Sequence, residues 1–136
     1  MSLSEIARRA GVAPATAHER LKKLRRASIV QGFSVDLNYC SLGYNLTAFV
    51  RLRTKFLDDI NKTINDLKGV PEVEEVHIVT GDYDLLVKVR AKDPMDLQQV
   101  LTSMHGATGF IRSATEVCLS SPLERAGPTI EALFKD

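Results

Sequence analysis

Hydrophobic and polar positions alternate along the chain in four segments, and each alternation predicts a half-buried β-strand. The clearest segment is 45–54, where every second residue from Leu46 to Leu52 is apolar. The other three segments are 74–80, 85–91 and 111–119. Gly81-Asp82-Tyr83-Asp84 has the composition of a turn, so the second and third strands are expected to pair as a hairpin.

Apolar residues recur every three or four positions between these strands, which predicts helices. The first helix is expected over 56–67, ending before Gly69. The second follows Asp93, a predicted cap, and has Pro94 in its first turn. The order βαββαβ predicts a ferredoxin-like α+β unit, an antiparallel sheet with both helices on one face. A further short helix is expected over 128–134.

The face of the sheet away from these helices is too mixed to form a second core. It is predicted to carry Phe49, Arg51, His77, Lys88 and Arg90. A partner subunit that lays its own sheet on this face would cover it, so we expect a dimer.

The first 30 residues have helical spacing. Ser2 and Glu5 are spaced as a capping box, in which the hydroxyl accepts a backbone hydrogen bond and the carboxylate returns one. Gly11 is suited to a turn at positive φ, and Pro14 to the first turn of a second helix. Ala7 is small enough for two helices to cross closely. Together these features predict a helix-turn-helix.

In a helix-turn-helix the start of the second helix enters the DNA major groove. The residues expected to face DNA are Ala15, Thr16 and His18 toward base edges and Arg20, Lys22 and Lys23 toward phosphates. Glu19 is expected to orient a nearby arginine, with acceptance from a cytosine amine as the alternative. An ordinary surface histidine is an equal alternative for His18.

Charge is distributed unevenly along the 136 residues, whose net charge is only +1. Through Val30 there are seven basic residues and two acidic ones, whereas the remainder has 11 basic and 15 acidic residues. A basic N-terminal segment followed by an acidic remainder is typical of a polyanion-binding module joined to another domain. The alternative is a charged helix that is merely solvated.

Composition narrows the class of protein further. A hydrophobic content of 44% with 26% charged residues is ordinary for a globular protein. No apolar run approaches the ~20 residues of a membrane span and no signal peptide is evident, so we expect a cytoplasmic protein without a membrane partner. Cys40 and Cys118 are interpreted as free thiols. Neither a metal site nor a catalytic set is predicted from the scattered His18, His77 and His105.

Two stretches, LSEIARRAGVAPATAHERLKKL (3–24) and TGDYDLLVKVRAKD (80–93), together with the order of elements, resemble the Lrp/AsnC or feast/famine family of bacterial and archaeal regulators. The resemblance covers nearly the whole chain. It implies a partial winged helix-turn-helix over 1–30, an extended connector over 31–43, and a βαββαβ effector-binding and oligomerisation domain over 44–136.

The resemblance also implies double-stranded DNA as a partner, dimers that assemble further, often into octamers, and an amino-acid effector held between domains of different dimers. No other cofactor is implied. Carried onto this sequence, the effector site comprises Gly81, Asp82, Tyr83, Asp84, Ser113 and Thr115. Turn N–H groups suit a carboxylate and an aspartate suits an ammonium. A plain hairpin turn is the alternative for the first four residues, and plain strand residues are an equal alternative for Ser113 and Thr115.

The sequence departs from the family pattern at two places within residues 1–30. A further helix that normally precedes the segment starting at Ser2 is absent, and we expect an upstream start or a truncation. The alternatives are a neighbouring chain that covers the exposed stripe and a DNA unit that is vestigial. Without that helix, the apolar side chains on the inner faces lack their cover, namely Ile6, Ala10, Leu21 and Leu24. Ala27-Ser28 stands where relatives usually carry an acidic residue and a glycine.

Three functions are therefore considered. The first is an amino-acid-responsive transcriptional regulator. The second is an effector-binding co-regulator that has lost independent DNA binding and acts by forming hetero-oligomers with full-length family members. The third is an enzyme of similar fold, as in haem-pathway decarboxylases, which the scattered histidines disfavour; no enzymatic activity is predicted.

Overall fold

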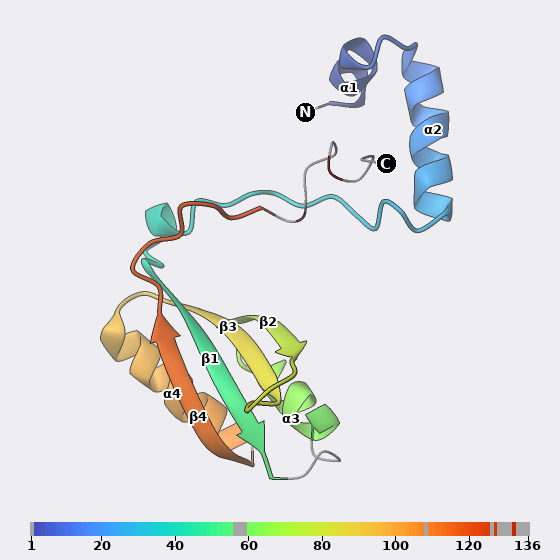
Figure 1. Ribbon diagram of the computed structural model, residues 1–136. Helices are drawn as coiled ribbons and strands as arrows, with labels where there is room; N and C mark the ends of the chain where they lie inside the picture. The colour runs from blue at the N-terminus through green and yellow to red at the C-terminus, as the bar shows by residue number, and fades with distance from the viewer. Residues whose placement is uncertain (1, 56–59, 108, 126, 128–131, 133–136) are drawn as a thin grey trace. The chain divides into compact units, whose positions relative to one another are not determined.

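The computed structural model describes residues 2–55, 60–107, 109–125, 127 and 132. The chain divides into two compact units, Met1–Leu37 and Asn38–Asp136, which we call the helical unit and the body (Figure 1). The short helix expected over 128–134 lies, apart from Ala132, outside the described residues. No helix among the described residues is both long enough and apolar enough to cross a membrane.

The helical unit contains α1 (Leu3–Arg9) and α2 (Pro14–Arg26). As predicted, Ser2 caps α1, and its hydroxyl accepts a hydrogen bond from the Glu5 N–H at 3.2 Å. The return bond of the predicted capping box is replaced, because the Glu5 carboxylate pairs with Arg8 and Arg9 at 3.1 and 3.2 Å. These arginines lie three and four residues ahead, on the same helix face, and offer a charged partner.

Both helices end in the same hydrogen-bonded motif. After α1, the Gly11 N–H donates to the Arg8 carbonyl and the next N–H donates to Ala7. After α2, the Ser28 N–H donates to Arg25 and the next N–H donates to Leu24. This Schellman pattern requires a left-handed residue, and φ is +62° at Gly11 and +56° at Ser28. Glycine adopts this conformation freely, whereas serine is strained in it.

The interior of the helical unit is small. The two helices meet at Ala7 and Ala17, which are buried, while Leu21 is half-buried. Ile6 and Leu24 are each 40% exposed, in agreement with the expectation that their faces lack cover. Residues 30–38 follow without helix or strand.

The body has the predicted order βαββαβ (Figure 1). After a short 3-10 helix at Cys40–Leu42, its elements are β1 (Leu46–Thr54), α3 (Ile60–Leu67), β2 (Val73–Ile78), β3 (Leu85–Ala91), α4 (Pro94–Ala107) and β4 (Phe110–Val117). The strands form one antiparallel sheet in the order β2-β3-β1-β4. Residues 56–59, where the first body helix was expected to begin, lie outside the described residues.

The core lies between the sheet and its two helices. Alternate side chains of β1 and β3, from Ala48 to Leu52 and from Leu85 to Ala91, are buried against α3 and α4. Asp93 caps α4 as predicted, and its Oδ1 accepts from the Asp96 N–H at 2.8 Å. Ile78, an apolar position of the alternating segment 74–80, departs from the burial that the alternation predicts: its side chain is 65% exposed, because it stands at the end of the edge strand β2.

Candidate DNA-binding and effector sites

The outer face of α2 is fully open. All six residues expected to face DNA are exposed, namely Ala15, Thr16, His18, Arg20, Lys22 and Lys23. Ala17, on the opposite side of the helix, is the buried contact with α1. Glu19 pairs with Lys22 at 3.5 Å, so its predicted arginine partner is wrong. Lys22 lies on the same helix face as Glu19, three residues further along.

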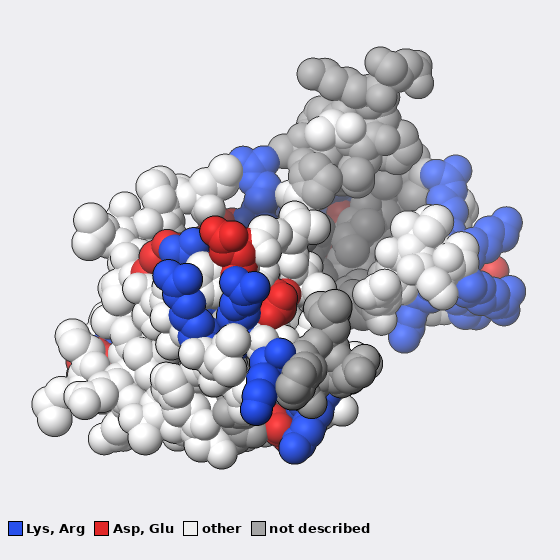
Figure 2. All heavy atoms as spheres, turned by 60° about the horizontal axis from the view of Figure 1, so that its bottom comes forward, with Lys and Arg blue, Asp and Glu red and all other residues white. Residues whose placement is uncertain are grey.

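The helical unit has an uneven surface charge. Its second helix ends in Lys23, Arg25 and Arg26, which is the favourable place for cations because carbonyl dipoles point there. Figure 2 shows Lys and Arg side chains gathered over this unit with little acidic surface among them, whereas on the body both signs lie side by side. This surface is suited to a polyanion.

The hairpin between β2 and β3 is the expected effector site. Its turn is closed by the Val79 N–H, which donates to the Asp84 carbonyl at 2.9 Å, and Gly81 has φ +108°. The Asp84 N–H donates to the Leu52 carbonyl at 2.9 Å, so the turn is also fastened to β1. A non-glycine residue would be strained at position 81.

The two aspartates of the hairpin have different environments. The carboxylate of Asp84 accepts from the Thr54 N–H at 2.7 Å and from its hydroxyl at 3.0 Å. Thr54 is only 6% exposed, so Asp84 satisfies two groups at the end of β1. Asp82 is exposed and is the carboxylate of the turn that faces solvent.

The other expected effector residues are not adjacent to the tyrosine of the turn. Ser113 and Thr115 pair in register with Leu52 and Val50, so they lie on the helix-covered side of the sheet, at its β4 edge. Tyr83 contacts the guanidinium groups of Arg51 and Arg112 instead, on the open side. The tyrosine of the turn and the two hydroxyls therefore lie on opposite faces of the sheet.

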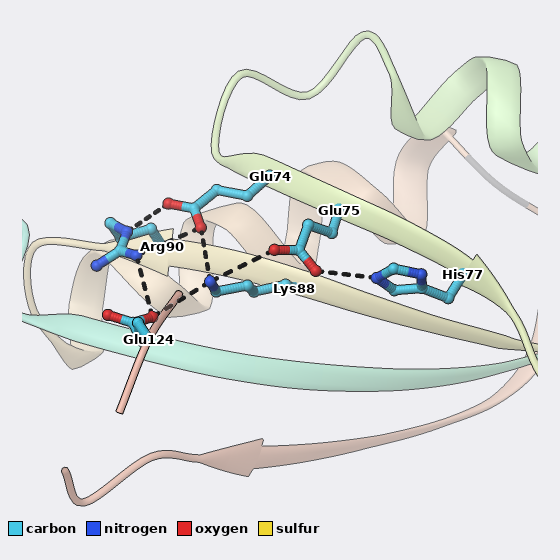
Figure 3. Close-up of polar contacts among 6 residues, drawn as sticks. All are labelled: Glu74, Glu75, His77, Lys88, Arg90 and Glu124. Carbon is cyan, nitrogen blue, oxygen red and sulfur yellow. Dashed lines mark hydrogen bonds and ion pairs between the residues drawn. The ribbon is translucent and has the colours of Figure 1, made fainter. Parts of the chain in front are cut away.

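The open side of the sheet carries the five residues predicted for it, and three of them, His77, Lys88 and Arg90, belong to a network of ion pairs with glutamates (Figure 3). Lys88 lies 3.3, 3.5 and 3.2 Å from carboxylate oxygens of Glu74, Glu75 and Glu124. Arg90 pairs with Glu74 and, at 3.7 Å, with Glu124. Glu124 belongs to the segment after β4, a contact that no local sequence pattern indicates.

The network changes the acidity of its members. Burial raises the pKa of Glu74, but the hydrogen bonds and positive charges of Arg90 and Lys88 together outweigh burial and hold this pKa below its usual value. The pKa of Glu75 is also lowered, mainly by its hydrogen bond with His77. The guanidinium of Arg90 lies 4.2 Å from the ring centre of Tyr39, a cation–π contact. The network therefore holds both signs of charge ionised on this face.

A cleft of about 300 Å³ beside the network is lined by both cysteines, Cys40 and Cys118, which are free thiols as predicted. Among the described residues, no three side chains of the metal-binding types gather as a metal site.

Comparison with known proteins agrees with this architecture. Residues 47–128 match the Lrp/AsnC ligand binding domain, and residues 1–32 match the IclR helix-turn-helix domain. A two-helix basic unit followed by such a ligand-binding domain defines a transcriptional regulator.

Proteins of similar sequence support the same assignment to transcriptional regulators. The HTH-type transcriptional regulator FL11 of Pyrococcus furiosus is 34% identical over 117 residues, which cover 86% of this chain and 77% of FL11. The regulatory protein AsnC of Escherichia coli K12 is 31% identical over 123 residues, covering 90% of this chain and 81% of AsnC. The chain thus belongs to the Lrp/AsnC family of transcriptional regulators, and these relatives are regulators rather than enzymes.

Solved structures share the fold. The structure of E. coli AsnC superposes with a TM-score of 0.83 at 28% identity, over 93% of this chain and 85% of that one. A Neisseria meningitidis regulator, solved as a complex with L-methionine, gives a TM-score of 0.88 at 23% identity, over 98% and 88%.

Proposed function

We propose that this regulator binds operator DNA in the cytoplasm through the outer face of α2 and that an amino acid modulates it from the body. The observation that carries the DNA-binding part is the exposure of all six expected DNA-facing residues on α2, opposite the buried Ala17. Helix N-terminal residues positioned in this way reach base edges, while flanking lysines and arginines neutralise phosphates.

The ligand we propose is an amino acid. Exposed Asp82 is placed to accept from an ammonium group, and the N–H groups around Gly81 suit a carboxylate. Ser113 and Thr115 supply hydroxyl groups from β4. These hydroxyls lie on the helix-covered side of the sheet, whereas Tyr83 contacts Arg51 and Arg112 on its open side. The complete site then needs a second copy, whose hydroxyls meet this hairpin. The methionine complex of the Neisseria regulator supports this ligand class.

Assembly is part of the proposal. Two copies cover each other's open sheet face, and further contacts between dimers bring a hairpin of one dimer to β4 of another, as in an octamer. Phe49 and Leu86 support the first step, because they are only half-buried on the open face of a single copy.

DNA binding is tested by fluorescence anisotropy of a labelled duplex across a salt series. Replacing Lys22 and Lys23 by Ala should weaken binding about tenfold at low salt and flatten the logarithmic salt slope by up to about 2, since each lost phosphate contact releases less counterion. The matched control replaces Lys62 and Lys68, exposed lysines of the body, and should leave both quantities unchanged. Affinity that is independent of salt, or equal losses in both variants, would contradict the proposal.

The ligand is tested by a thermal-shift screen of the twenty amino acids, read together with assembly size. A ligand that binds only the assembled protein raises the melting temperature and the assembled fraction together. Asp82→Ala should abolish both responses with little change in the melting temperature of the free protein. The ligand proposal fails if no amino acid shifts the wild type.

The co-regulator alternative rests on a specific observation, the 40% exposure of Ile6 and Leu24. If that stripe needs a cover from another protein, the chain would act only in hetero-oligomers with full-length family members. Sequence-specific DNA binding by the purified chain would rule this alternative out.

A further inference from the structure

Like charges face each other at one corner of the open sheet face. Arg53 on β1 is paired in register with Arg112 on β4, and Arg51 stands two residues before Arg53 on the same side. Like charges directly opposite each other across a strand pair destabilise the pair. We call Arg51, Arg53 and Arg112 the arginine corner.

The charge of the arginine corner is only partly balanced within the chain. Glu116 pairs with Arg51, and the guanidinium carbons of Arg51 and Arg112 lie 4.9 and 5.5 Å from the ring centre of Tyr83. Among the residues that the structure describes, no carboxylate forms an ion pair with Arg53 or Arg112. The Nε of Arg51 is buried and has no hydrogen-bond partner in the same set. The uncompensated positive charge of this corner therefore favours binding of an anion.

The diagonally opposite corner of the same face has an excess of carboxylates. Glu74, Glu75 and Glu124, the carboxylate corner, surround Lys88 and Arg90, and Glu75 also contacts His77 (Figure 3). These glutamates lie on and beside β2 and β3, near the start of β1, whereas the arginines lie on β1 and β4 near the end of β1. Half-buried Phe49 and Leu86 lie between the two corners.

We propose that the open face is electrostatically self-complementary, so that in the dimer the arginine corner of each copy lies on the carboxylate corner of the other. This inference rests on the proposed dimer and assigns its orientation. In this arrangement the two-fold axis lies in the plane of the interface and runs diagonally across the strands. Rotation about it places the arginine corner of one copy over the carboxylate corner of the other. Every contact of such an isologous interface occurs twice.

A second copy fits this face better than a small anion does. A small anion would satisfy Arg53 and Arg112 but would leave Phe49 and Leu86 in contact with water. A second sheet covers these apolar side chains and supplies carboxylates at the required corner. Charge complementarity of this kind fixes the register of an interface.

The test is the dimer dissociation constant from sedimentation equilibrium at low and high salt. Arg53→Gln combined with Arg112→Gln removes four arginine contacts per dimer and should raise the constant roughly tenfold at low salt, with a shallower salt dependence. The same variant should unfold at an unchanged or higher denaturant concentration when monomeric, because it removes a like-charge pair. Lys62→Gln with Lys68→Gln serves as the matched control and should change neither quantity.

Two results would overturn the proposed orientation while leaving the dimer intact. A tighter dimer in the arginine variant would show that arginine corners face each other. An unchanged dimer constant, with inorganic phosphate raising the melting temperature of the wild type but not of the variant, would show that a small anion occupies the corner. A wild type that is monomeric at every concentration would instead refute the dimer itself.

Discussion

The helical unit and the body use amphipathic helices in contrasting ways. In the body, two helices cover one face of a sheet, and the enclosed core extends from Ala48 on β1 to Met104 on α4. In the helical unit, two helices meet at a pair of alanines and leave Ile6 and Leu24 partly exposed. Small interiors bury too little apolar surface to be stable alone. The core therefore contributes most to the stability of the body, whereas caps and turns contribute a larger share in the helical unit.

The largest expected effect is a truncation in the core of the body. Leu52→Ala should lower the free energy of unfolding by about 3 kcal/mol, because Leu52 is fully buried and its loss leaves a cavity. Leu24→Ala, in the helical unit, should cost less than about 1 kcal/mol, since this side chain is already partly exposed. Urea unfolding of both variants measures the difference, and equal losses would refute the contrast.

The turn of the body should show the next largest effect. Asp84→Ala leaves the N–H and the hydroxyl of Thr54 without their acceptor, which should cost about 1–3 kcal/mol of stability. Asp82→Ala is the control in the same turn and should change stability by less than about 0.5 kcal/mol, because Asp82 is exposed. If the two variants unfold at the same urea concentration, the structural role assigned to Asp84 is wrong.

A smaller effect is expected at the helix ends of the helical unit. Ser28→Gly should stabilise this unit by about 1 kcal/mol, since glycine adopts the left-handed conformation without strain. Gly11→Ala should destabilise it by a similar amount for the same reason. Amide hydrogen exchange in α1 and α2 reports both changes. Faster exchange in the glycine variant would contradict this account of the cap.

The smallest effect is the pH dependence of the body. The folded-state pKa values of Glu74 and Glu75 lie below their usual 4.5, so their contribution to stability is present above about pH 4.5 and is lost as the pH falls through the lowered values. Lys88→Gln should reduce this acid sensitivity, because the Lys88 cation lowers the pKa of both carboxyl groups. Thermal unfolding between pH 7 and pH 3 tests it, and identical profiles would contradict it.

Much of the fold could be predicted from the sequence because local patterns determine it. The alternation in 45–54 and the cap at Asp93 correspond to real elements, and Ser2 and Gly11 form the local bonds expected of them. The predictions that failed concern properties set by a residue's position in the tertiary structure. Ile78 has the right period for burial but stands at the exposed end of an edge strand.

The candidate sites were harder to predict for the same reason. Exposure of the α2 face follows from helical period alone, whereas the partners of Glu5 and Glu19 depend on which charged neighbour is nearer. The pairing of Glu124 with Lys88 joins residues 36 positions apart, so only the folded chain shows it. The effector-binding roles proposed for Ser113 and Thr115 invoke a second copy and stay predictions.

The proposal that DNA binds to the helical unit and not to the body is tested most directly by amide NMR shifts on adding duplex DNA at low salt. Binding through α2 predicts perturbed amides from Ala15 to Lys23 and unchanged amides across β1 and β3. Nonspecific duplex suffices, because phosphate contacts supply most of such binding. Perturbations confined to the body, with α2 unchanged, would contradict the account.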